Sequence, residues 1–239
     1  MVSRIKKSFI FLVFIALLII GFIGGNLFFQ GQERYEEAIA EKPIEKAVNE
    51  IISKEHFVSY EEIDKDFLNA LVSIEDHRFF ERKGIDFYSI GRAFVSNLIS
   101  GKVSQGGSTI TQQLAKNIYF SHSKSITRKF AEIFFVYEFE ELYSKEEILA
   151  MYANIIYYGD GYTGISAASK GYFDKDPNDL SLYEASILAG LPQAPSIYQL
   201  SKGYNEINKR QKAVLESMVK NKYITKEEME ETLKLQPKQ

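Results

Sequence analysis

The chain has 239 residues, which suffices for one folded domain plus an appendage, and its hydrophobic (45%) and charged (26%) contents are ordinary for a folded protein. A net charge of −3 argues against a general nucleic-acid binder, because such proteins usually carry a basic excess. The absence of cysteine excludes disulfide bonds, thiolate metal sites and cysteine nucleophiles.

The first predicted element is an uncharged apolar stretch at residues 9–29, behind a short tail of residues 1–8. At helical rise it covers the roughly 30 Å hydrocarbon core of a bilayer, so it predicts a transmembrane anchor. Basic residues precede the stretch and acidic residues follow it, so the positive-inside rule predicts a cytoplasmic N-terminus and an extracytoplasmic remainder on a bacterial cell membrane. The alternative is a cleaved signal peptide, since Ala38-Ile39-Ala40 resembles a cleavage site, although it lies well beyond the apolar run.

Residues 30–55 are rich in charge and contain Pro43, which predicts a stalk or linker. Residues 56–236 predict one mostly α-helical domain, because helix-start signals of the S/T-x-x-E type recur and no run of alternating strand pattern appears. These signals are Ser59 with Glu62, Ser144 with Glu147, Ser181 with Glu184, and Thr225 with Glu228. Apolar residues at helical spacing (Ile63, Phe67, Leu71 and Ile74) predict the first helix of this domain.

Glu75 is expected at the end of this first helix, on the same face as Leu68 and Leu71. A carboxylate on such an apolar stripe is partly desolvated and lies beside the like charge of Asp76, and both effects suit a general base near neutral pH. The alternative is that Glu75 and Asp76 merely end a helix in solvent. Alone, the pair is weak evidence for catalysis.

The segment GGSTITQQLAKN, residues 106–117, combines a flexible glycine pair with Ser108, which is well placed to cap a helix. Ser108, Gln112 and Lys116 are spaced by four and share one helical face. A helix N-terminus beside a lysine suits an anionic group such as a sugar pyrophosphate. The alternative is a capped helix with a solvated surface.

The segment KFAEIFFVYEFEEL, residues 129–142, is apolar around most of its circumference and predicts a helix enclosed by the domain. Arg128 and Lys129 stand four and three residues before Glu132, a spacing that permits ion pairs within the helix. The two cations could equally neutralise a departing phosphate at the mouth of a cleft. The apolar stretch at residues 87–99 predicts either a core helix or a helix resting on the bilayer surface.

Five segments together carry a family resemblance: EDHRFFERKGID, GGSTITQQLAKN, RKFAE, KEEILAMYANIIYYGDGYTGISAASKGYF and LSLYEASILAGLPQAPSIY. In this order they resemble the motifs of the family 51 peptidoglycan glycosyltransferases, and the resemblance covers about residues 56–220. It implies a lysozyme-like helical fold and elongation of β-1,4-linked glycan from lipid II, with release of undecaprenyl pyrophosphate and inversion at the sugar carbon. Glu75 matches the general base of the family, and Glu132 matches a second glutamate that organises the donor site.

The resemblance also implies a set of substrate-binding residues around these two glutamates. The set is Asp76, Phe79, Arg82, Ser108, Thr109, Gln112, Gln113, Lys116, Asn117, Arg128, Lys129 and Asn154, with the three cations Lys116, Arg128 and Lys129 on the phosphate side. The expected partners are lipid II, the nascent glycan chain, the membrane and other cell-wall synthesis proteins, with no nucleic acid. No tightly bound cofactor and no protein-held metal are expected, because the three histidines form no ligand pattern. A divalent cation, Mg or Mn, could still travel with the pyrophosphate.

Three positions depart from the family pattern: Arg82 replaces a common histidine, Ala150 a common glutamate and Tyr158 a common phenylalanine. The chain ends soon after the fifth motif, so the expectation is a polymerase without the penicillin-binding transpeptidase domain of many relatives. Two alternatives are a lysozyme-like glycan-cleaving enzyme, which shares the fold and relies on one glutamate, and a non-catalytic scaffold that binds lipid II.

Overall fold

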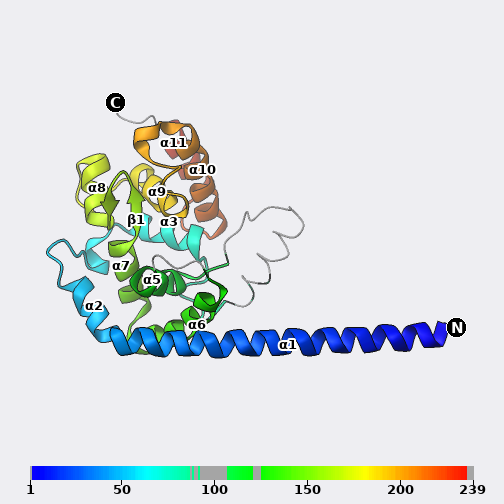
Figure 1. Ribbon diagram of the computed structural model, residues 1–239. Coiled ribbons are helices and arrows are strands. Elements are labelled where there is room, and N and C mark those ends of the chain that lie inside the picture. The colour runs from blue at the N-terminus through cyan, green and yellow to red at the C-terminus, as the bar shows by residue number, and fades with distance from the viewer. Residues whose placement is uncertain (1, 87, 89–90, 92–106, 121–124, 236–239) are drawn as a thin grey trace.

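The computed structural model describes residues 2–86, 88, 91, 107–120 and 125–235 (Figure 1). Its long helices are α1 Val2–Glu41, α2 Ile44–Ile52, α3 Lys65–Glu75, α5 Ile110–Tyr119, α6 Ile126–Leu142, α7 Lys145–Ile155, α8 Ile165–Phe173, α9 Leu182–Gly190, α10 Tyr204–Lys220 and α11 Lys226–Lys234. Three short 3-10 helices, η1 Tyr60–Glu62, η2 Leu191–Gln193 and η3 Leu200–Lys202, and one hairpin complete the order. The predicted fold class, a mostly helical domain behind one apolar N-terminal helix, is confirmed.

Helix α1 is continuous, and its N-terminal half extends beyond the domain while its C-terminal half lies along α6 (Figure 1). Within the described part of the chain it is the one helix long and apolar enough to cross a membrane, judged by length and composition. Gly31 permits the close approach of the two helices, because a Cβ at this position would overlap Phe130 Cβ. Two ring contacts lie along the same seam between α1 and α6, where Tyr35 stacks on Phe134 and lies edge-on to Phe135.

The segment predicted as a linker, residues 30–55, is folded onto the domain instead. It contains the last turns of α1 and the whole of α2. Pro43 occupies the N-cap position of α2 and so separates the two helices. Ile44, Val48 and Ile51 of α2 are buried in the main core. Apolar residues stand at helical spacing among the charges of α2, so they form the buried face of an amphipathic helix.

The core of the domain brings side chains of α5 and α10 to the C-terminal end of α3. Helix α3 packs against α9 and α10, and α5 packs against both α6 and α7. Large fully buried side chains, among them Phe67, Phe135 and Tyr152, fill the space between these helices. Glu75 at the end of α3 therefore meets groups that come from α5 and α10.

Helix starts follow the predicted capping boxes, and all four boxes are confirmed. The first box, however, caps only the single turn η1. Helix α3 begins later, where Asp64 accepts a hydrogen bond from the backbone N–H of Phe67 at 3.0 Å. A short hairpin, β1 Tyr157–Gly159 with β2 Tyr162–Thr163, was not predicted, since its strands are too short to show an alternating pattern. The predicted helix at residues 87–99 lies almost entirely outside the described residues.

Candidate active site

The carboxylate of Glu75 is held from two sides. Its side chain is 13% exposed, and Gln113 Nε2 donates a hydrogen bond to Glu75 Oε2 at 2.8 Å. The hydroxyl of Tyr152 donates to Gln113 Oε1 at 2.9 Å, which fixes the direction in which the amide of Gln113 points. The guanidinium of Arg210 lies 3.5 Å from the other oxygen, Glu75 Oε1. The alternative in which Glu75 ends its helix in solvent is therefore wrong.

Glu132 forms the centre of a second charged group. It is fully buried, one oxygen pairs with Arg128, and the other lies 2.7 Å from Lys129 Nζ. The predicted ion pairs within the helix are thus confirmed. Lys129 also donates to Ser108 Oγ at 2.8 Å, which ties α6 to the segment before α5.

Cations outnumber anions in this group. Lys116 on α5 forms no ion pair within the described part of the chain. Burial, then the nearby charge of Arg128, lowers the pKa of Lys116, and the opposing attraction of Glu132 and Glu75 only partly offsets this. Arg128 Nε is buried and has no hydrogen-bond partner among the described residues. Lys116, Arg128 and Lys129 therefore gather positive charge and an unused donor around one buried carboxylate, an arrangement suited to an anionic ligand.

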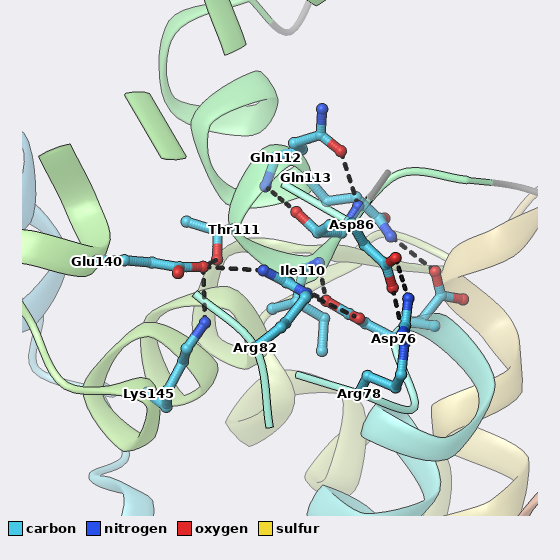
Figure 2. A network of polar contacts seen from close by, with 12 residues as sticks. Asp76, Arg78, Arg82, Asp86, Ile110, Thr111, Gln112, Gln113, Glu140 and Lys145 are labelled. Atoms are coloured by element: carbon cyan, nitrogen blue, oxygen red, sulfur yellow. Dashed lines mark hydrogen bonds and ion pairs between the residues drawn. The ribbon is translucent and has the colours of Figure 1, made fainter. Parts of the chain in front are cut away.

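Next to Glu75, a network of polar contacts fixes the chain that follows α3 (Figure 2). Asp76 pairs with Arg82 and accepts a hydrogen bond from the backbone N–H of Ile110 at 3.1 Å. Arg82 lies between Asp76 and Glu140, with 3.2 Å to a Glu140 oxygen (Figure 2). These contacts bind the end of α3 to the first turn of α5 and to α6.

Glu140 collects the other contacts of this network. It lies 2.7 Å from Lys145 Nζ and accepts hydrogen bonds from Thr111 Oγ1 at 2.8 Å and from the backbone N–H of Gly84 at 2.7 Å. Burial raises the pKa of Glu140, but these bonds outweigh it and hold the pKa below its usual value. The network is therefore charged on both sides, and its two carboxylates Asp76 and Glu140 have cationic partners within the protein.

Comparison with known proteins settles the family. The model described as Transglycosylase matches residues 42–219. The chain belongs to this transglycosylase family. Membership confirms the resemblance seen in the motifs and the assignment of the chain to the peptidoglycan glycosyltransferases.

Several relatives of the transglycosylase domain are longer proteins. Penicillin-binding protein 1A of Neisseria lactamica is 44% identical over 165 residues, which cover 69% of this chain and 21% of that protein. Penicillin-binding protein 1F of Bacillus subtilis (strain 168) is 36% identical over 238 residues, covering 94% of this chain and 33% of that protein. The chain thus spans about a fifth to a third of the length of these relatives. A crystal structure of penicillin-binding protein 1A from Haemophilus influenzae matches 75% of this chain and 17% of its own, at 23% identity and a TM-score of 0.45, a likeness too low to carry an argument.

Some residues predicted to bind substrate in the transglycosylase domain have contacts within the protein. Thr109, rather than Ser108, is the N-cap of α5, and it forms a capping box with Gln112, both side chains being buried. Phe79 is fully buried in the core under Lys145, whose Nζ lies 4.6 Å from the ring centre. The ring of Phe79 has no exposed surface, so its contact with substrate stays a prediction.

Four polar residues of the predicted set likewise have partners within the protein. Asp76 and Arg82 bond each other, and Arg82 also bonds Glu140. The amide of Asn154 bonds the backbone of Val58 in both directions, at 3.0 and 2.8 Å, and donates to the Ala150 carbonyl. These contacts support positioning roles. Asn117 donates to the Gln113 carbonyl within α5 at 2.9 Å.

Arg210 and Tyr152 are the site residues that sequence reasoning missed. Arg210 lies on α10 beyond the fifth motif, and Tyr152 lies inside the fourth motif without having been singled out. A signal existed for Arg210, because Ile207, Arg210 and Val214 follow helical spacing and the two apolar residues are buried. An arginine on the buried face of a helix requires an anionic partner.

Proposed function

We propose that this transglycosylase domain polymerises lipid II into β-1,4-linked glycan strands and releases undecaprenyl pyrophosphate. The observation that carries the proposal is the pairing of two groups. Glu75 is held from two sides and stays partly exposed. Lys116, one of the cations near Glu132, interacts with the charges of both glutamates. A carboxylate base beside a surplus of cations matches the needs of a reaction whose leaving group is a pyrophosphate.

In the proposed reaction, Glu75 accepts the proton of the 4-hydroxyl of the acceptor N-acetylglucosamine. The oxygen of that hydroxyl attacks C1 of the donor N-acetylmuramic acid, and the bond from C1 to the pyrophosphate oxygen breaks with inversion from α to β. The bond from Gln113 keeps the carboxylate in one orientation, which favours proton transfer to a fixed position.

The leaving pyrophosphate takes the bonding electron pair and needs its charge neutralised more than it needs a proton. Lys116, Arg128 and Lys129 supply this positive charge. Glu132 holds Arg128 and Lys129 at fixed positions, so we assign it a role in organising the donor side rather than in proton transfer.

The lipid carrier of the substrate requires a site near a membrane. We infer that α1 spans the bilayer with its N-terminus in the cytoplasm and the domain outside, as the charges on either side of its apolar run predict. Because α1 packs along α6, it keeps the helix that bears Arg128 and Lys129 beside the membrane-spanning segment. Other proteins of cell-wall synthesis stay predicted partners.

The proposal needs no metal held by the protein. In the residues that the structure describes, no three histidine, aspartate or glutamate side chains gather as a metal site. A divalent cation would instead arrive on the pyrophosphate of the substrate. Measuring polymerisation at increasing chelator concentration tests whether Mg or Mn is required.

Glu75→Gln tests the proposal, because it preserves shape and removes the base. The full chain is incubated with lipid II in detergent, and glycan polymer is measured on gels. We expect a loss of at least about 100-fold, the usual contribution of general-base catalysis. Glu141→Gln is the matched control, since Glu141 is exposed on the same domain, and it should polymerise normally. Full activity of Glu75→Gln would refute the assignment.

A further inference from the structure

We propose that Arg210 is a positioning residue of the polymerisation reaction, which holds the Glu75 carboxylate in one orientation beside a fixed positive charge. This inference rests on the proposed function and extends it to α10, a helix that carries none of the predicted site residues. The geometry points to a clamp with Gln113 on one carboxylate oxygen and Arg210 on the other.

The first observation is how Arg210 itself is held. Its side chain is only 11% exposed, and Nε donates a hydrogen bond to the Gly190 carbonyl at the end of α9, at 3.1 Å. This bond fixes the plane of the guanidinium, so the terminal nitrogen that faces Glu75 has a defined position. Burial lowers the pKa of Arg210, and the charge of Glu75 opposes that effect. A largely covered cation is costly without an anion, and Glu75 is the anion that Arg210 faces.

The second observation is the separation between the groups. At 3.5 Å, Arg210 and Glu75 Oε1 form an ion pair without a tight hydrogen bond, whereas Oε2 has a close donor in Gln113. Oε1 is therefore the oxygen with the more available lone pairs. We assign it as the atom that accepts the substrate proton, with Arg210 stabilising the anion until the proton arrives.

The third observation is the fit around Gly190. A Cβ on this residue would come within 2.9 Å of Arg210 Cγ, so the absence of a side chain is what admits the arginine stem. The backbone of Gly190 has φ −80° and ψ −24°, which alanine adopts without strain. Gly190→Ala therefore displaces the guanidinium while leaving its charge in the protein.

Other groups also act on Glu75 and are unchanged by substitutions at Arg210. Lys116 on α5 and Tyr152 on α7 both interact with the charge of Glu75, and Asp76 follows Glu75 in the chain. Loss of Arg210 thus removes one stabilising cation and leaves Lys116 as the remaining one. Oε1 of Glu75 then has no fixed neighbour, so the carboxylate can turn away from the substrate hydroxyl and kcat should fall.

The experiment compares Arg210→Ala, Arg210→Lys and Gly190→Ala with the wild type, using the full chain and lipid II. We expect Arg210→Ala to lower kcat at least about tenfold, with KM within about threefold. Arg210→Lys should retain part of the activity, and Gly190→Ala should lower kcat in the same direction. Lys212→Ala, which removes an exposed cation from the same helix, should behave as the wild type.

Two results would overturn the inference: an unchanged kcat in Arg210→Ala, or a loss in Arg210→Ala that appears in KM and not in kcat. If Arg210→Ala unfolds, thermal unfolding reveals it, and kcat and KM of Arg210→Lys and Gly190→Ala decide. Failure of the proposed function looks different, because then the wild type itself makes no polymer from lipid II.

Discussion

The seam between α1 and α6 offers the sharpest test of how the anchor positions the site. Gly31→Ala places a methyl group where it would overlap Phe130 Cβ and come within 3.0 Å of the backbone nitrogen of Ala131. Non-bonded heavy atoms normally stay about 3.5–4.0 Å apart, so relieving the overlap with Phe130 Cβ requires α6 to retreat by more than about 1 Å. Overpacking of this kind costs about 1–3 kcal/mol.

The matched control is Gly24→Ala, because a Cβ at Gly24 meets nothing within 4 Å. Both changes gain the same helix propensity, so their difference isolates the packing cost. Thermal unfolding in detergent should show Gly31→Ala melting roughly 2–12 °C below Gly24→Ala. Polymerisation should fall as well, because the displaced helix carries Arg128 and Lys129. Equal melting temperatures and equal activities for the two variants would refute the reasoning.

Two further predictions concern α5 and its cation. Thr109→Ala and Thr225→Ala each remove a capping box and should each cost about 1 kcal/mol in chemical denaturation. Only Thr109→Ala should also slow polymerisation, since α5 carries Gln113, and an equal loss in Thr225→Ala would contradict this. Because burial and Arg128 lower the pKa of Lys116, this lysine loses its charge at a lower pH than an ordinary lysine. KM for lipid II should therefore rise toward alkaline pH in the wild type and stay flat in Lys116→Arg, because arginine keeps its charge. The same rise of KM in both proteins would count against the assignment of Lys116 to the phosphate side.

Features that depend on short stretches of chain were predictable from the sequence. The four capping boxes and the ion pairs of Arg128 and Lys129 with Glu132 follow from spacing within one helix, and the structure has them all. Glu75 was placed at the end of its helix for the same reason. Its part in catalysis rested on the ordered motifs, since periodicity alone favoured an idle carboxylate.

Features that depend on distant partners were not predictable. Arg82 was expected to bind substrate. In the structure it pairs with Asp76 at the end of α3 and with Glu140 on α6, which lies far along the chain, and so it links the two helices. Asn154 is bonded to Val58 for the same kind of reason. The contact between Arg210 and Glu75 exists only because α3 packs against α10, which no local pattern reveals.

The central claim, glycan polymerisation from lipid II, is tested most directly by product analysis of the wild-type reaction. The full chain is incubated with lipid II, and the linkage of the glycan and the amount of undecaprenyl pyrophosphate are measured together. We predict β-1,4-linked polymer and one undecaprenyl pyrophosphate released for each bond formed. Shortening of preformed glycan without polymer formation, or binding of lipid II without turnover, would contradict the account.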